Sequence, residues 1–455
     1  MGRGKVGMEN RTLCIRVIER ARELMGDIGF LGRHRTRPED FTRQRCFSFP
    51  VVMLLVLQKT LKSIQLHLQE FFEALSKEAQ QRRVASDGAW TQARAKLKHT
   101  AFIELNQEAV LKPLEASAED LLLWRGMRLV SNDSSLLRLP WSEALFAHFG
   151  GQEVIEQDGT RRVRVPHARL SVAYDCLNRV AIDARVGTFN QGEIGLALGH
   201  LNFLRPGNLW VGDRGYSSYV MLARLRARNI DFVVRCKRHS FREADELFSR
   251  NEDGASISTS LSAKRARGAN PDESLPETIC VRFVSVRLSS GELEVLVTSL
   301  LDEESFPPES LKEVYHWRWG VESFYGQLKG LLDLENLSGL TVEAMLQDIH
   351  AAVFLCGLES ILSREAQSQI NHPSSSPSRK RHQQKLNHHV SFHALKSRVI
   401  DLLIGKDPAE KVFAELTALF LAKPVAIRPE RSSPRYPPRT SRSLNYQKRV
   451  RKITF

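Results

Sequence analysis

The stretch SLKEVYHWRWGVESFYGQLKGLL, residues 310–332, decides how the rest of the chain is interpreted. Its apolar residues recur at helical spacing, which predicts one continuous helix. At about 100° per residue, four other residues fall within roughly 60° of one another on the opposite face: Tyr315, Arg318, Glu322 and Lys329. A hydroxyl, two cations and a carboxylate on one stripe could place a metal ligand beside phosphate-binding groups. The alternative is a solvated face of an amphipathic helix, which is the usual meaning of such a pattern.

Composition narrows the class of protein. The 455 residues carry a formal net charge of +14, with 42% hydrophobic and 26% charged residues. These values are typical of a soluble chain with two to four domains, and a chain this basic usually binds a polyanion, most often nucleic acid. The longest apolar run, residues 49–57, is too short to span a bilayer, so we expect no membrane association.

Cysteine usage indicates the compartment. The six cysteines are scattered, with neither a C-x-x-C pair nor zinc-site spacing. Free thiols in a reducing cytoplasm are therefore expected.

Residues 1–125 are predicted to form a helical N-terminal domain. Ser86 is a plausible N-cap for a helix that carries Arg94, Lys96 and Lys98. A short break before a basic helix is compatible with a helix-turn-helix-like DNA reader, and a plain helical bundle explains it equally well. The charge of the whole chain favours DNA binding.

From residue 126 the apolar period changes to that of strands. A short strand is predicted to end at Asp133, a hairpin spans residues 169–186, and another strand ends at Asp213. Strands alternating with helices over residues 126–237 predict a mixed α/β sheet. We interpret Asp175 as a hairpin-turn residue and Asp183 as a solvent-facing one.

The remaining residues divide into three further segments. Residues 238–307 begin polar and turn-rich and then show a hairpin around Gly291, which predicts a β-rich insertion. Residues 308–370 return to the core with the helix that carries Glu322. Residues 371–455 combine a polar linker, short helices and a basic tail from Arg428, which by composition needs an anionic partner to become ordered.

Three acids stand out as candidate metal ligands: Asp133, Asp213 and Glu322. Mg²⁺ prefers oxygen ligands, and two ions about 4 Å apart can stabilise both the attacking and the leaving oxygen in phosphoryl transfer. Taken singly, Asp133 and Asp213 are more simply explained as turn residues beside Ser134 and Gly215.

Several motifs resemble one known family. The spacing Tyr-x-x-Arg-x-x-x-Glu-x-x-x-x-x-x-Lys within YHWRWGVESFYGQLK matches the Y-R-E-K motif of bacterial DDE transposases of the insertion-sequence-four family. DRGY at residues 213–216 is similar to the family's second-aspartate motif, and NDSS around Asp133 to the first, with Ser where many members have Gly. Segments near both ends of the chain, including WTQARAKL and HHVSFHALKSRV, also resemble the family.

This resemblance implies an RNase H-like core interrupted by the β-rich insertion. It implies Asp133, Asp213 and Glu322 as catalytic ligands of two Mg²⁺ ions, with Mn²⁺ as a substitute. Further residues would contact DNA: Tyr315, Arg318, Lys329 and Arg214. The implied activity is cleavage of double-stranded DNA at terminal inverted repeats and joining of the freed 3′-hydroxyl to target DNA, by a homodimer on DNA in a bacterial cytoplasm.

Two other functions fit the residues. One is a related metal-dependent nuclease without strand transfer. The other is a DNA-binding protein that has lost catalysis, although all three expected acids are present.

Overall fold

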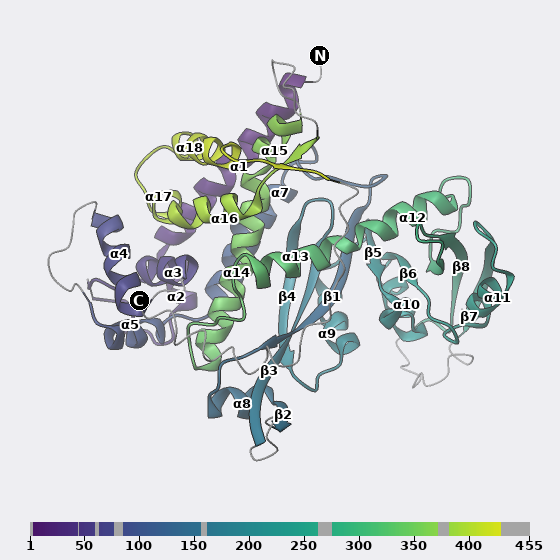
Figure 1. Cartoon of the computed structure of the whole chain (residues 1–455), viewed down its shortest axis with the longest axis horizontal. Helices are drawn as coiled ribbons and strands as arrows, with labels where there is room; N and C mark the ends of the chain where they lie inside the picture. The colour runs from purple at the N-terminus through teal and green to yellow at the C-terminus, as the bar shows by residue number, and fades with distance from the viewer. Residues whose placement is uncertain are drawn as a thin grey trace. The chain divides into compact units, whose positions relative to one another are not determined.

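The computed structural model describes residues 3–43, 45–59, 63–76, 85–155, 162–262, 275–371 and 382–428. The chain forms two compact units, and Figure 1 labels their helices and strands. The sheet unit comprises Leu122–Leu137 and His167–Gly326, and the helical unit comprises Met1–Leu121, Arg138–Pro166 and Gln327–Phe455. The basic tail beyond Arg428 and much of the predicted linker lie outside the described residues. The five segment boundaries derived from the sequence stay predictions.

The sheet unit contains most of the β-structure. Its strands are β1 (Arg128–Arg138), β3 (Arg162–Asp175), β4 (Val180–Thr188), β5 (Asn208–Gly212), β6 (Asp231–Arg235), β7 (Ser256–Ser262), β8 (Thr278–Arg287) and β9 (Leu293–Thr298). The last residue of β1 and the first residues of β3 are assigned to the helical unit. Its helices are α9 (Glu193–His200), α10 (Tyr219–Arg226), α11 (Arg242–Arg250), α12 (Pro308–Trp317) and most of α13 (Trp319–Gly330), with 3₁₀ turns η2 (Leu201–Phe203) and η3 (Arg214–Tyr216).

The strand order identifies the core. The strands run β4-β3-β1-β5-β6-β9-β8-β7, where β1, β5 and β6 are parallel neighbours and β3 and β4 form an antiparallel hairpin. A hairpin beside three parallel strands is the arrangement of an RNase H-like core, so the predicted mixed α/β fold is confirmed. The hairpin predicted for residues 169–186 is present as well.

Burial explains why these segments form central strands. The residues Leu209, Trp210 and Val211 of β5 are completely or almost completely buried, as expected for parallel strands covered on both faces. Helices α9 and α10 supply Ala197 and Met221, among others, to the same apolar core.

The segment predicted as a β-rich insertion extends the core sheet. Strands β9, β8 and β7 continue it antiparallel beyond β6, and the β8–β9 hairpin turns at Gly291 with φ +85°, a conformation that favours glycine. The expectation of a mainly turn-rich stretch after residue 238 was wrong, because α11 forms there and packs on β8 and β9 (Figure 1).

The helical unit is arranged around one long helix. Its helices are α1 (Arg3–Gly26), α2 (Ile28–His34), α3 (Phe49–Gln58), α4 (Ile64–Ser76), α5 (Asp87–Arg94), α6 (Thr100–Leu105), the π-turn η1 (Asn106–Leu111), α7 (Lys112–Glu115), α8 (Glu143–Phe149), α14 (Val342–Leu362), α15 (Arg364–Asn371), α16 (His388–Ser397), α17 (Val399–Leu403) and α18 (Ala409–Leu421). Short strands are β2 (Gly151–Ile155), which pairs with the start of β3, and β10 (Gln384–Lys385), which pairs with β11 (Val425–Ala426).

Helix α14 is the centre of this unit and contacts α1, α3, α6 and η1 (Figure 1). By length and composition alone it could cross a membrane, and 94% of its apolar window is buried inside the structure. Burial of this kind is ordinary for the core helix of a large domain.

One expected basic residue proves to be structural. The N-cap at Ser86 is confirmed, but the long basic helix predicted after it ends at Arg94. Arg94 is buried and donates to Gln347 Oε1 at 2.8 Å and to Asp348 Oδ1 at 2.7 Å on α14. Its guanidinium therefore holds the helical core together and cannot read DNA, so the interpretation of Arg94 as part of a DNA reader was wrong.

Candidate active site

Two of the candidate acids lie on or next to neighbouring parallel strands. The β1–β5 ladder ends with Ser131 paired to Val211; Asp133 lies two residues further along β1, and Asp213 two residues further along the chain, directly after β5. Adjacent strands lie about 4.8 Å apart, so the two side chains start from neighbouring backbones. The prediction that β1 ends at Asp133 was wrong, because β1 continues to Arg138 beside β3.

Asp213 follows the last residue of β5 and begins the turn η3. Its Oδ1 accepts hydrogen bonds from the Arg214 amide at 2.6 Å and from the Tyr315 hydroxyl at 3.3 Å. Asp213 is thus the turn residue that its sequence context suggested, and it is also held by the helix α12.

The predicted helix over residues 310–332 is interrupted at Arg318. Helix α12 ends at Trp317 and α13 begins at Trp319, with tight i→i−3 bonds from the Arg318 amide to Tyr315 and from the Val321 amide to Arg318. The continuous helix expected from periodicity was therefore wrong in this detail, because i→i−3 bonds wind the backbone more tightly than an α-helix.

Three of the four motif residues are in contact around this break. Arg318 is buried, its Nη2 donates to Glu322 Oε1 at 2.9 Å, and its guanidinium lies 5.5 Å from the Tyr315 ring centre. Tyr315 in turn contacts Asp213. The chain Asp213–Tyr315–Arg318–Glu322 therefore connects the end of β5 to α13.

Burial changes the acidity of this cluster. It raises the pKa of Asp133 to about 6; the Arg318 guanidinium lowers that pKa and the Glu322 carboxylate raises it. Burial also raises the pKa of Tyr315 to about 12, so the hydroxyl stays protonated. The two carboxylates are close enough to repel each other, and a cation between them would favour their ionised forms.

The donor chemistry fits a hard divalent cation. Asp133, Asp213 and Glu322 come from three elements of one unit and supply only carboxylate oxygens, the ligands that Mg²⁺ prefers. Within the described residues, no three His, Cys, Asp or Glu side chains are close enough to form a closed metal site, and Glu322 is turned towards Arg318. The residue types fit a metal, while the side chains adopt an open arrangement.

The remaining predicted DNA contacts lie elsewhere. Lys329, in the last turn of α13, belongs to the helical unit, where its Nζ lies 3.3 Å from Glu335 Oε1. Arg214 lines a cavity of about 820 Å³ in the sheet unit.

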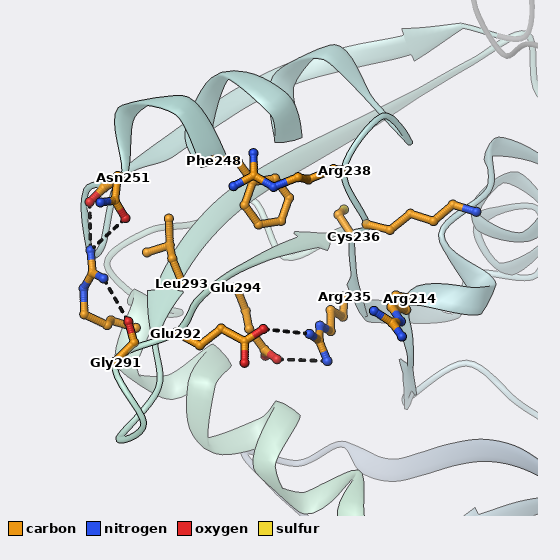
Figure 2. Close-up of a pocket in the computed structure, with 12 residues that line it drawn as sticks. Arg214, Arg235, Cys236, Arg238, Phe248, Asn251, Gly291, Glu292, Leu293 and Glu294 are labelled. Atoms are coloured by element: carbon orange, nitrogen blue, oxygen red, sulfur yellow. Dashed lines mark hydrogen bonds and ion pairs between the residues drawn. The ribbon is translucent and has the colours of Figure 1, made fainter.

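This cavity is strongly basic, and Figure 2 shows its lining residues. Five cations line it against two acids, Glu292 and Glu294: Arg214, Arg235, Lys237, Arg238 and Arg287. The Arg238 guanidinium lies 4.7 Å from the ring centre of Phe248, and Arg235 reaches Glu294 at 3.0 Å and Glu292 at 3.5 Å (Figure 2).

Sequence reasoning missed Arg235 and Glu294. Glu294 is buried and burial raises its pKa, with Arg235 lowering it. The basic run that begins at the last residue of strand β6, RCKR at residues 235–238, was visible in the sequence. Only the packing of β9 against β6 shows that this run faces an acid and an open cavity.

Two other acids of the sheet region, Asp175 and Asp183, were assigned structural positions from the sequence, and the structure shows the environment of each. Asp175, at the hairpin end of β3, is completely buried and accepts from Arg128 Nε at 2.6 Å and from Asn178 at 2.8 Å. Asp183 was predicted to face solvent, which was wrong: its carboxylate lies 2.7 Å from His200 Nδ1, and His200 Nε2 lies 3.0 Å from the Ser171 hydroxyl. A long-range partner on α9 was not visible in the strand's alternation.

The fold and the acids together define an α/β enzyme class, an RNase H-like domain with carboxylates on β1, after β5 and on a following helix. More specifically, the chain belongs to the transposase DDE domain family, whose model matches residues 124–356, just over half of the chain.

Two further comparisons complete the picture. A cryo-EM structure of a piggyBac transposase synaptic complex with hairpin DNA is similar at a TM-score of 0.40 and 10% identity, covering 99% of this chain and 85% of that one. No curated protein sequence matches.

Proposed function

We propose that this transposase belongs to the insertion-sequence-four group and cuts double-stranded DNA at the inverted repeats of its element. In this proposal the freed 3′-hydroxyl is then joined to target DNA. The observation that carries it is the position of Asp133, Asp213 and Glu322 within the one RNase H-like unit that the family model covers. The spacing of the Y-R-E-K residues supports the group assignment.

Each site residue has a proposed role. Asp133, Asp213 and Glu322 would hold two Mg²⁺ ions, or Mn²⁺ in their place, which when bound activate the attacking oxygen and stabilise the leaving one. Tyr315 orients the Asp213 carboxylate, as their 3.3 Å contact indicates. Arg318 holds Glu322 and would contact a backbone phosphate, since a guanidinium can bind phosphate with two N–H groups. Lys329 would likewise contact a DNA phosphate.

The basic cavity extends the proposed DNA surface. Arg214 follows Asp213 directly and lines the cavity with four other cations. We expect this cavity to hold backbone phosphates close to the scissile bond, because several cations converge there while only Glu292 and Glu294 oppose them.

Assembly and compartment belong to the same proposal. Because an element has two ends, we expect a homodimer on DNA, acting in the bacterial cytoplasm. A stoichiometry measurement on the complex with end DNA would test the dimer, and one chain per DNA end pair would contradict it.

The deciding experiment uses a linear duplex that carries the terminal repeats together with a supercoiled target plasmid and Mg²⁺. Wild-type protein should give both cut ends and joined products. Asp133→Asn, Asp213→Asn and Glu322→Gln should each lower cleavage at least about 100-fold while still binding the duplex. Cut ends without joined products would favour a nuclease, and full activity in the three variants would overturn the assignment of the acids.

A further inference from the structure

A pocket in the helical unit has no role in the proposed chemistry. It has a volume of about 460 Å³ and lies between the end of α3, the residues after α13, and α16. Its polar lining consists chiefly of Gln58, Lys59, Asp333, His389, His393 and Lys396. We propose that this pocket binds one backbone phosphate of DNA through Lys59 and Lys396.

The two lysines lie against each other at the pocket. Lys396 Nζ donates to the Lys59 carbonyl at 2.9 Å, and Lys59 Nζ donates to the Asp333 carbonyl at 3.4 Å. Both partners are neutral backbone groups. Within the described part of the chain, neither ammonium forms a direct ion pair with a carboxylate. The Asp333 and Asp348 carboxylates act on both lysines from further away, and Asp348 is already paired with Arg94.

Two ammonium groups in a partly buried place are costly. Burial and the neighbouring Lys59 together lower the pKa of Lys396 to about 8, although Asp333 and Asp348 act in the opposite direction. Buried charges in proteins are normally paired, so two ammonium groups that line one pocket without a direct ion pair favour an anionic ligand.

The rim of the pocket fits such a ligand. His389 and His393 are exposed and lie one turn apart on α16, so both can offer N–H donors. Asp333 is exposed as well, and among the described residues it is the one acid that lines the pocket. Two lysines and two histidines line the pocket against this single acid, which suits one phosphate.

The source of the phosphate follows from the whole chain. A protein with a formal net charge of +14 that acts on DNA meets backbone phosphates at high local concentration. This inference rests on the proposed function, because it takes DNA as the partner.

The test measures how duplex binding depends on salt for the full chain between 50 and 200 mM NaCl. Loss of one phosphate contact lowers the slope of log K against log salt by about 0.9. We expect that change in Lys59→Gln/Lys396→Gln, with cleavage of bound DNA retained. The matched control is Lys411→Gln, which removes an exposed lysine of the same unit that pairs with Asp407 at 3.1 Å.

Three outcomes would overturn the inference. An unchanged slope in the double variant, with wild-type protein binding and cutting DNA, would rule out a DNA phosphate in the pocket and leave the proposed function intact. Raised thermal stability of wild-type protein in inorganic phosphate, absent in the double variant and without a slope change, would assign the pocket to free phosphate. A lower unfolding temperature of the double variant with an unchanged slope would show that the lysines only hold the two carbonyls.

A separate observation concerns two tyrosines. Tyr216 and Tyr325 each lie three residues after a candidate acid, Asp213 and Glu322 respectively, and both are buried. The Tyr216 hydroxyl lies 3.1 Å from the Asn132 amide, and the Tyr325 hydroxyl donates to the Asp133 carbonyl at 2.9 Å. The Tyr325 hydroxyl therefore contacts the backbone of Asp133 itself, and the Tyr216 hydroxyl contacts Asn132, the residue before it on β1.

We infer that Tyr216 and Tyr325 are positioning residues that fix the spacing of the three carboxylates. A buried hydroxyl without a partner costs free energy, so each tyrosine keeps its own element in register with β1. The Ser171 hydroxyl, 3.4 Å from the Asp133 carbonyl, adds a third support from β3.

Removal of each hydroxyl tests this role. Tyr216→Phe and Tyr325→Phe should raise the Mg²⁺ concentration needed for half-maximal cleavage by roughly 10–100-fold, the usual effect of groups that orient ligands, with duplex binding unchanged. Tyr219→Phe is the matched control, since its buried hydroxyl donates to the Pro276 carbonyl at 2.6 Å and contacts none of the acids. Wild-type Mg²⁺ dependence, or a change equal to that of Tyr219→Phe, would contradict the inference.

Discussion

At the scale of single residues, Asp133 shows how burial can prepare a metal ligand. Its pKa is raised to about 6, above its ordinary value of 3.8, so the folded chain favours the protonated form at mildly acidic pH. Above pH 6 the carboxylate is ionised at a cost to folding. A divalent cation would offset that cost, which is how a site can trade stability for function.

The sign of this shift predicts a stability change. Asp133→Asn removes a buried carboxylate, so in metal-free buffer above pH 6 it should raise the free energy of unfolding by about 1 to 3 kcal/mol. The difference from wild type should shrink as the pH falls from 6 to 4, because the Asp133 carboxyl of the folded wild-type protein becomes protonated and therefore neutral, like the amide in the variant. Urea unfolding across this pH range provides the measurement, and a variant less stable than wild type at pH 7 would contradict the assigned shift.

The same pKa predicts how cleavage depends on pH. Protons compete with the cation for Asp133, so the apparent Mg²⁺ affinity should fall as the pH drops through 6. Titrating Mg²⁺ in cleavage assays at pH 5.5, 6.5 and 7.5 checks this. An affinity independent of pH would show that Asp133 is not a ligand.

Arg235 and Glu294 form a second residue pair with a separable role. Arg235→Gln leaves the buried Glu294 without its cation and should cost about 1 to 3 kcal/mol of stability. Adding Glu294→Gln should recover most of that stability without restoring DNA affinity. Thermal unfolding and duplex titrations of both variants measure the two effects, and recovered affinity in the double variant would contradict a phosphate contact by Arg235.

At the scale of elements, α12 and α13 together carry one side of the site. Arg318 lies at the interruption between them and contacts Tyr315 three residues before it and Glu322 four residues after it. These are the spacings at which side chains on a helix are neighbours, so the shared face predicted from the sequence persists across the interruption.

Helix α5 supplies a prediction for the helical unit. Arg94→Met removes the cation that pairs with the buried Asp348, so it should destabilise the chain by about 3 to 5 kcal/mol. Lys96→Met, on the turn after α5 where Lys96 is partly exposed and lies 3.9 Å from Asp40, should cost much less. Urea unfolding separates the two, and equal losses would contradict the structural role of Arg94.

At the scale of the whole molecule, the parts visible in the sequence are those that follow from a period. Alternating apolar residues predicted β3 and β4, an apolar run predicted β5, and the spacing of Tyr315, Arg318 and Glu322 predicted a shared face. Long-range pairing was not predictable: Arg94 with Asp348, Asp183 with His200 and Arg235 with Glu294 join residues more than ten positions apart. Each polar residue resembled a surface residue until its partner was known.

The basic tail yields a prediction for the chain as a whole. We expect it to add nonspecific DNA affinity through counter-ion release. Truncation after Ile427 should therefore reduce the salt dependence of duplex binding and leave the Mg²⁺ dependence of cleavage unchanged. An unchanged salt slope would show that the tail only solubilises the protein.

The central claim is that three carboxylates hold divalent cations, and metal rescue of Asp213→Cys tests it most directly. A thiolate is a soft ligand that suits Mg²⁺ poorly and Mn²⁺ better. If Asp213 is a ligand, the variant should be inactive in Mg²⁺ and should regain cleavage of terminal-repeat DNA in Mn²⁺. Full activity in Mg²⁺, or equal loss in both ions by a variant that unfolds at the wild-type temperature, would contradict the claim.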